Sequence, residues 1–261
     1  MKQKFITKPK VYLVGTQQVN DEHLKEFLND EEIAEFTTDT VIPGEILAES
    51  AGRICYMSFG KGRKSNREYL DNIISSHHGS VLEHVVWNFV ITGISRSLTH
   101  ELIRHRAGFA YSQLSQRYVD ESDAQFVCPP LYVDHPELKK KWEDMMERAH
   151  RNYCELADST AEYVKEKYPE LKGTDRRKLV RQSARSVLPN STETKLFVSA
   201  NARSWRHFLE MRGSRHADTE IRELALAIFR VLKPQAPNIF ADMDIVKDEG
   251  VEEIRVTHSK V

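Results

Sequence analysis

The stretch RHRAGFAYSQLSQRY, residues 104–118, brings together residue types that bind anions. Arg104, His105 and Arg106 are adjacent, and Arg117 follows after a run that contains serine and glutamine. The planar guanidinium group of arginine matches the oxygens of a phosphate and can bind them bidentately. Serine and glutamine add hydrogen-bonding groups for a sugar or a base edge. The stretch predicts a site for a phosphate-bearing ligand; the alternative is a solvated basic helix end, which the helix dipole favours.

Two further segments are rich in arginine. Residues 181–189, RQSARSVLP, contain Arg181 and Arg185, and residues 199–222, SANARSWRHFLEMRGSRHADTEIR, contain Arg203, Arg206, Arg212, Arg215 and Arg222 together with His207 and His216. Convergence of the three segments on one polyanionic small molecule explains them jointly, although part of them can be an ordinary surface. RNA is an alternative ligand. The net charge of −1 and the lack of interleaved aromatic residues argue against it.

Other chemistry-bearing patterns are weaker. The tract HHGSVLEH, residues 77–84, could hold a metal, but a turn at Gly79 followed by a strand would separate its side chains. His100 and His105 in HELIRH are five residues apart, not four, so they do not match the zinc-protease motif. Cys55, Cys128 and Cys154 have no metal spacing or catalytic context, and we expect packing roles for them. A reaction at this site therefore needs a cofactor.

Composition limits the class of protein. The 261 residues suffice for one large domain. The near-zero net charge excludes a generally basic nucleic-acid binder. An odd number of cysteines indicates a reducing compartment, so we expect a cytoplasmic protein. The start of the sequence has no signal-peptide pattern, and no apolar run reaches the roughly 18 residues of a membrane span, so we expect no membrane association.

The spacing of apolar residues, together with the residues that end helices and strands, predicts the elements that position these residues. We expect strands at 10–15, 83–93 and 194–202 and a polar loop at 58–66. We expect helices at 43–57, 67–79, 95–106, 135–170, 174–189 and 218–233, with 135–170 as one long helix or two in series. Glu101, Arg104 and His105 would share a face of the helix at 95–106. We predict one α+β domain over residues 1–261, with a helical lobe.

Several of these motifs together resemble the flavin-dependent thymidylate synthases. The resemblance rests on four motifs: RHRAGFAYSQLSQRY, HGSVLEH, RSVLP and NARSWRHFLEMRGSRHADTEIR. The matching segments cover about residues 44–235 and occur in the order expected for the family. The resemblance implies a homotetramer with active sites between subunits, each binding FAD. It also implies methylation of dUMP to dTMP with carbon from methylenetetrahydrofolate and hydride from NADPH, without a cysteine nucleophile.

The resemblance also implies roles for individual residues. The implied FAD contacts are Ser80, Arg104, His105, Arg106, Gln113, Asn201, Arg203 and His207, with His78 and Glu83 in the flavin-side histidine segment. The implied dUMP contacts are Glu101, Arg104, Gln113, Ser115, Arg117, Arg185 and Arg212. Arg212 matches the arginine that polarises the uracil. A cation there would stabilise a uracil anion, which is more electron-rich at C5.

One departure from the family pattern lies in residues 107–110. Eight residues separate Arg106 from Ser115 where the family has seven, so the resemblance assigns no role to AGFA. The sequence leaves two other functions open. One is C5 methylation of UMP, and the other is binding of a nucleotide or RNA without turnover.

Overall fold

Helices and strands are mixed along the chain without a regular βαβ alternation, so the fold is α+β, as the sequence predicts. The structure is a computed structural model that describes residues 5–33 and 36–261. The chain divides into two compact units. Unit 1 contains the chain up to Lys10, Ile91–Ile103 and Ser112–Leu196, and unit 2 contains Val11–Val90, Arg104–Tyr111 and Phe197–Val261. The organisation as a single catalytic domain stays a prediction.

A four-stranded sheet has the strand order β2-β3-β6-β4. Its strands are β2 (Lys10–Gly15), β3 (Val86–Ser95), β4 (Phe109–Gln113) and β6 (Glu193–Asn201). Side chains alternate between the two faces of a strand, and in β3 the buried ones include Trp87 and Phe89. The three predicted strands are confirmed with small shifts at their ends, whereas the sequence did not predict β4.

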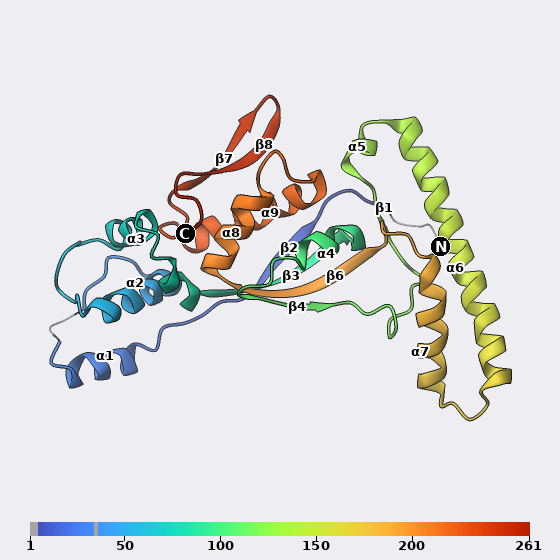
Figure 1. The fold of residues 1–261 in the computed structure, drawn as a ribbon, viewed down its shortest axis with the longest axis horizontal. Helices are drawn as coiled ribbons and strands as arrows, with labels where there is room; N and C mark the ends of the chain where they lie inside the picture. The colour runs from blue at the N-terminus through green and yellow to red at the C-terminus, as the bar shows by residue number, and fades with distance from the viewer. Residues whose placement is uncertain (1–4, 34–35) are drawn as a thin grey trace. The chain divides into compact units, whose positions relative to one another are not determined.

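Unit 2 packs its helices around a core of aromatic and aliphatic side chains. Its further elements are α1 (Asp21–Asp30), α2 (Pro43–Tyr56), α3 (Asn66–Ser75), the 3-10 helix η1 (Gly79–His84), α8 (Ala202–Arg212), α9 (Thr219–Gln235), β7 (Met243–Asp248) and β8 (Val251–Val256). Figure 1 shows α8 and α9 side by side, with the antiparallel β7–β8 hairpin next to them. Trp205 and Phe208 of α8 are fully buried, and the Trp205 ring lies 5.3 Å from that of Phe89.

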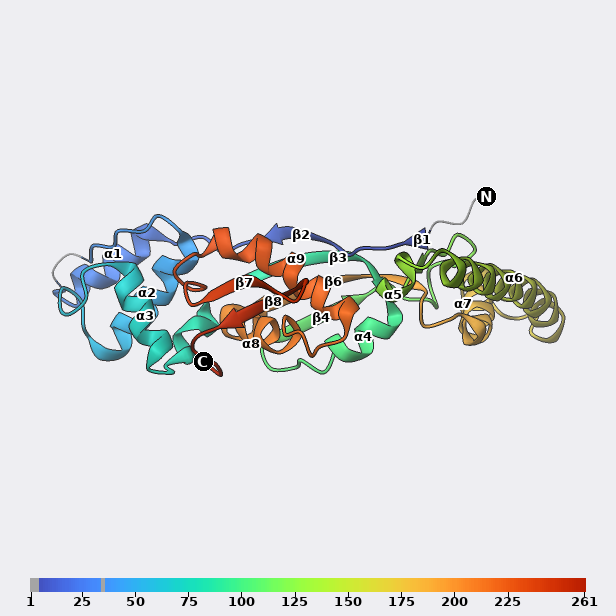
Figure 2. The same cartoon turned by 90° about the horizontal axis from the view of Figure 1, so that it is seen from above.

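Unit 1 contains the helical lobe that the sequence predicts. Its elements are β1 (Phe5–Ile6), α4 (Arg96–Leu102), β5 (Phe126–Val127), α5 (Pro130–Val133), α6 (Pro136–Lys167), α7 (Gly173–Ala184) and the 3-10 helix η2 (Arg185–Val187). Helices α6 and α7 lie side by side in both views (Figures 1 and 2). Because α6 runs without a break from Pro136 to Lys167, the predicted segment 135–170 is one helix and not two in series. Strands β1 and β5 pair in parallel, and Phe126, Cys128 and Trp142 form a small core beside them.

Several predicted helices end earlier than expected; α7, predicted to reach residue 189, ends at Ala184 and is followed by the 3-10 helix η2. Helix α3 ends at Ser75, and His77 with a φ of 57° turns the chain into η1, so Gly79 begins an element where we expected it to end one. Helix α4 starts at its N-cap Ser95, as predicted, but ends at Leu102. Arg104 and His105 therefore do not share a helix face with Glu101. The sequence also did not predict α1, α8 or the β7–β8 hairpin.

A buried ion pair ties α8 to the segment that follows α9. The Arg206 guanidinium donates to both carboxylate oxygens of Asp242 at 2.7 and 3.0 Å, and both side chains are buried. Arg206 also donates to the carbonyl oxygen of Ile239 at 2.7 Å. Burial by itself raises the pKa of Asp242, but the hydrogen bonds and charge of Arg206 and the His258 N–H outweigh it, so this pKa is lowered overall.

We predict that Arg206→Met lowers the free energy of unfolding by about 3–5 kcal/mol at pH 7, because it leaves the Asp242 carboxylate buried and unpaired. Chemical denaturation measures this change. The control is Arg230→Met, which breaks the exposed Arg230–Glu252 pair and should cost less than about 1 kcal/mol. Equal effects of the two substitutions would contradict the assignment. Because the pKa of Asp242 is lowered, the wild type should lose this stabilisation as the pH falls through that lowered pKa.

Candidate active site

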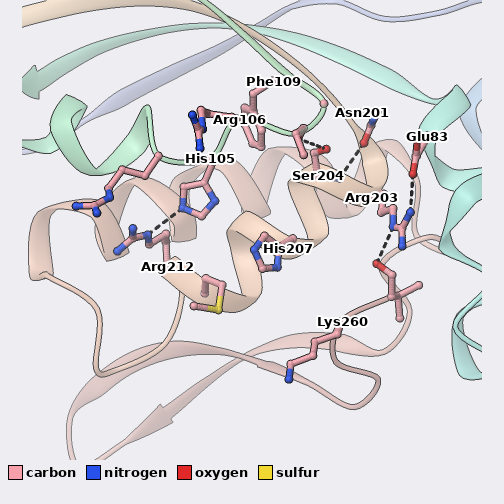
Figure 3. A pocket seen from close by; sticks show the side chains of 15 residues that line it. Glu83, His105, Arg106, Phe109, Asn201, Arg203, Ser204, His207, Arg212 and Lys260 are labelled. Atoms are coloured by element: carbon pink, nitrogen blue, oxygen red, sulfur yellow. Dashed lines mark hydrogen bonds and ion pairs between the residues drawn. The ribbon is translucent and has the colours of Figure 1, made fainter.

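A cavity of about 820 Å³ lies in unit 2, where α8 meets the segment that follows α4 (Figure 3). Its lining comes from η1, the segment 104–109, α8 and the residues after β8. The lining residues are Glu83, Arg104, His105, Arg106, Ala107, Gly108, Phe109, Asn201, Arg203, Ser204, His207, Met211, Arg212, Lys260 and Val261. A cavity of this size is in the range that holds a cofactor or a small-molecule ligand.

Helix α8 presents one face to this cavity and the other to the core. The side chain of Asn201 caps the helix by accepting a hydrogen bond from the Ser204 N–H at 2.8 Å. Arg203, His207 and Met211 follow at intervals of four residues, so they share the face that lines the cavity. The buried side chains of the opposite face fix the orientation of the helix, and so the direction of these three residues.

The segment 104–109 is held in place by three polar contacts. Tyr111 Oη donates to the His105 carbonyl oxygen at 2.7 Å, and Ser204 Oγ donates to the Ala107 carbonyl oxygen at 2.8 Å. The Asn201 N–H donates to the Gly108 carbonyl oxygen at 3.4 Å. Gly108 has a φ of 70°, and a Cβ there would lie 2.1 Å from Ser204 Oγ. Only glycine allows this close approach to α8.

His105 is the most strongly perturbed group of the cavity. Burial, then the charge of Arg212, then that of His207, lower the pKa of His105 from 6.5 to about 4. The imidazole is therefore neutral at pH 7 and accepts a hydrogen bond on Nε2 from Arg212 Nε, at 3.0 Å. The ring of Phe208 packs edge-on against it, with centroids 5.3 Å apart. This hydrogen bond fixes the orientation of the Arg212 side chain.

Positive charge dominates the cavity. Its lining contains four arginines, one lysine and one acidic side chain, that of Glu83. Arg203 pairs with Glu83 at 2.6 Å, and its Nε donates to the main-chain oxygen of Val261 at 3.3 Å. Within the described part of the chain, Arg104, Arg106 and Lys260 make no ion pair. Such a site favours an anionic ligand, because opposite charge relieves the repulsion among these groups.

The structure brings together most of the predicted cofactor residues. Seven of the ten residues predicted to bind FAD line the cavity: Glu83, Arg104, His105, Arg106, Asn201, Arg203 and His207. Arg212, predicted to bind dUMP, lines it as well. His78, Ser80 and Gln113 do not line it. His78 is exposed and stacks on Tyr56 with ring centroids 6.2 Å apart, beside a separate cavity of about 310 Å³. Ser80 is exposed on η1.

The other predicted nucleotide-binding residues lie in unit 1: Glu101, Gln113, Ser115, Arg117 and Arg185. Gln113 Nε2 donates to Thr194 Oγ1 at 3.3 Å. Ser115 Oγ accepts from the Arg117 N–H at 3.3 Å, and the Arg117 guanidinium lies 6.0 Å from the centroid of the Tyr118 ring. The charge of Arg185 contributes to a lowered pKa of Arg96, after the larger effect of burial. None of these five residues is among those that line the cavity of unit 2.

Not every arginine of residues 199–222 serves the cavity. Arg206 is buried in its ion pair with Asp242, and Arg215 pairs with Asp248 and Glu249. Arg222 donates to the carbonyl oxygen of Arg215 at 3.0 Å. The expectation that these arginines converge with the other segments on one ligand is therefore wrong for three of the five. Their guanidinium groups bond instead to acidic or carbonyl groups elsewhere in unit 2.

The sequence reasoning missed several lining residues. Ala107, Gly108 and Phe109 fall where the spacing departs from the family pattern. Ser204 and Met211 follow from the period of α8, which a helix assignment over 202–212 would have revealed. Lys260 and Val261 reach the cavity only through the β7–β8 hairpin, and no local pattern in the sequence indicates this.

The weaker motifs do not form sites. In the described ranges, no three or more histidine, cysteine or acidic side chains gather as a metal would require. Cys128 is buried and Cys154 half-buried, but Cys55 is exposed on α2, so the expectation that it packs inside a helix is wrong. No cysteine is among the residues that line the cavity. No helix among residues 5–33 and 36–261 is long and apolar enough to cross a membrane.

The donor set of the cavity fits a flavin dinucleotide. Guanidinium and ammonium groups suit a pyrophosphate, and the Asn201 amide and His207 imidazole can bond to ribose or ring atoms. A cation such as Arg212, held by a neutral histidine, could stabilise negative charge on a bound ring.

Comparison with known proteins identifies the family. Residues 39–238 match the family described as thymidylate synthase complementing protein. The chain is 50% identical over 206 residues to the flavin-dependent thymidylate synthase of Mycobacterium sp. strain KMS, covering 77% of this chain and 81% of the relative. It is 50% identical over 208 residues to that of Mycobacteroides abscessus (77% and 80%) and 49% identical over 206 residues to that of Mycobacterium avium strain 104 (77% and 80%). The chain therefore belongs to the thymidylate synthase complementing protein family, the family of these flavin-dependent thymidylate synthases.

Proposed function

We propose that the protein is a flavin-dependent thymidylate synthase that methylates dUMP to dTMP. FAD would be its cofactor, methylenetetrahydrofolate its carbon donor and NADPH its hydride donor, and we place the reaction in the cytoplasm. The names of the similar mycobacterial proteins support this. The single observation that carries the proposal is the basic cavity of unit 2, in which a neutral His105 holds Arg212 and most of the predicted FAD-binding residues come together.

Different residues would bind different parts of FAD and dUMP. Arg104, Arg106 and Arg203 would bind the pyrophosphate of FAD, with Asn201 and His207 as further contacts. When bound, FAD supplies the hydride transfer that these side chains cannot perform. In unit 1, Ser115, Arg117 and Arg185 would bind the phosphate of dUMP, and Glu101 and Gln113 its sugar or base.

Arg212 would act on the substrate itself. A guanidinium beside the uracil favours loss of the N3 proton, which makes C5 more electron-rich and able to attack a carbon electrophile. The neutral His105 accepts a hydrogen bond from Arg212 Nε and so keeps the guanidinium in one orientation. This route needs no cysteine nucleophile. C5 methylation of UMP remains the second candidate reaction.

We further propose a homotetramer with active sites shared between subunits. An unpartnered apolar stripe on α6 supports association: Leu138, Met145, Leu156 and Tyr163 are exposed by 45%, 56%, 39% and 58%. Steps of seven and eleven residues are about two and three helical turns, so the four side chains share one face. Arg148 and Glu155 flank the stripe on one side, so an antiparallel α6 of a second subunit would bring opposite charges together.

We predict that the purified protein binds FAD, shows flavin absorbance bands and forms dTMP from dUMP faster than it methylates UMP. Arg212→Ala should keep the fold and most of the FAD but lower kcat by at least about 100-fold, because the uracil is no longer polarised. Steady-state turnover measured beside the flavin spectrum tests both statements.

The matched control for this experiment is Arg230→Ala, an exposed arginine outside the cavity, which should leave turnover unchanged. A protein that cannot be reconstituted with FAD would favour the binding-module alternative. Near-wild-type turnover of Arg212→Ala would remove Arg212 from the mechanism. A preference for UMP would move the assignment to the second candidate reaction.

We predict that Met145→Lys combined with Leu156→Lys dissociates the tetramer into smaller species, because charges would then face each other on the α6 stripe. Light scattering coupled to size-exclusion chromatography gives the mass. Arg151→Glu, also exposed on α6 but off the stripe, should leave the tetramer intact. A double variant with unchanged mass, or a wild-type monomer that is active, would contradict this interface.

A further inference from the structure

Residues 257–261 bring Lys260 and Val261 into the lining of the cavity, although the segment lies outside the family match, which ends at residue 238. They follow β8 and reach the cavity from the side of the β7–β8 hairpin, where Figure 3 shows Lys260. Neither the sequence motifs nor the family comparison assigns a role to any of them. The position of these residues therefore raises the question of what they contribute to the ligand.

Hydrogen bonds fix this segment along its length. The Thr257 and His258 N–H groups donate to the carbonyl oxygen and to Oδ2 of Asp242, at 3.0 and 3.1 Å. The Lys260 N–H donates to Glu210 Oε2 on α8 at 3.1 Å, and the Val261 main-chain oxygen accepts from Arg203. Because Asp242 is itself held by the buried Arg206, the anchoring extends into the core.

The far end of the segment is also tightly packed. Val261 is buried, and a Cβ added at Gly79 would lie 2.6 Å from its carbonyl carbon. This contact places the end of the segment against the start of η1, which also provides Glu83 to the cavity. The segment is therefore a fixed wall and not a loose end lying over the site.

Lys260 is held in an uncommon backbone conformation. Its φ of 57° is in the left-handed region, which costs conformational energy in a residue other than glycine. The contacts on both sides maintain this conformation. Its side chain is exposed at the cavity, and within the described ranges its ammonium group makes no hydrogen bond or ion pair. The fold thus places one more cation at a cavity whose lining already contains four arginines.

We propose that Lys260 binds a phosphate group of the nucleotide in this cavity and that residues 257–261 form the wall that positions it. An ammonium group is a compact charge with three donors, suited to a single phosphate oxygen. The proposal rests on the proposed function, because it takes a phosphate-bearing nucleotide as the ligand. Both FAD and dUMP carry this chemistry, and the experiment separates them.

The test is a binding titration followed by flavin fluorescence for FAD and riboflavin, and by calorimetry for dUMP and deoxyuridine. The proteins are flavin-free wild type, Lys260→Ala and Lys260→Arg. We expect Lys260→Ala to weaken the binding of one phosphate-bearing ligand by about tenfold, as for one charge-assisted hydrogen bond. Its phosphate-free counterpart should bind as to wild type, and Lys260→Arg should restore most of the affinity.

The matched control is Lys247→Ala, an exposed lysine on β7 that does not line the cavity, which should bind every ligand as the wild type does. A loss confined to FAD identifies its pyrophosphate as the partner of Lys260, and a loss confined to dUMP identifies the monophosphate. Unchanged affinity for both, or an equal loss for riboflavin, would overturn the inference. A wild type that binds no flavin or nucleotide would instead defeat the proposed function, so the two failures are distinguishable.

Discussion

The repulsion among positive charges around a partly desolvated cavity is the constraint on which the site depends. Four arginines and Lys260 surround a volume whose lining contains one acidic side chain. Like charges in such surroundings interact more strongly than in bulk water. The effect is visible at His105, where burial and the adjacent Arg212 lower the pKa to about 4. The same environment that disfavours another cation favours an anionic ligand.

Holding these charges in place requires a rigid support, and α8 provides it from two sides. Trp205, Phe208 and Arg206 face inward, where aromatic packing and the ion pair with Asp242 fix the helix. Arg203 and His207 face the cavity from the same helix. One helix therefore carries both the support and the binding groups, and a disturbance of its buried face would displace the groups on the other.

The Asp242 carboxylate links this support to the far wall of the cavity. It accepts from Arg206 of α8 and from the His258 N–H of the segment that leads to Lys260. The buried ion pair thus contributes to more than the stability of unit 2. It also connects α8 to the segment that forms the wall, because both bond to the same carboxylate.

Much of the site could be predicted from the sequence, because its residues occur in short motifs. The family resemblance of the RHR and NARSWRH motifs predicts roles for Arg104, His105, Asn201, Arg203 and His207, and all five line the cavity. The fold class and the long helix α6 followed from periodicity. The sequence could not show that Arg206 is buried. Without knowing which face of α8 packs against the core, a buried arginine cannot be distinguished from an exposed one.

Long-range contacts set the limit of the prediction. Lys260 enters the cavity through a hairpin whose packing depends on Gly213 and Ile254, 41 positions apart. Beyond the end of α4, Tyr111 of the next strand donates a hydrogen bond to the His105 carbonyl oxygen. Neither contact leaves a local pattern. The helix at 95–106 was predicted too long, and the wall at 257–261 was missed.

The pKa of His105 tests the account most directly, because it reports the charge and burial of the cavity before any ligand binds. Histidine-selective NMR on the flavin-free protein, with His105→Gln used to assign the signal, would give its titration curve. The account predicts a pKa of about 4 in the wild type and a higher value in Arg212→Ala, since a neighbouring cation disfavours the imidazolium. A wild-type value near the ordinary 6.5, or no rise after removal of Arg212, would contradict it.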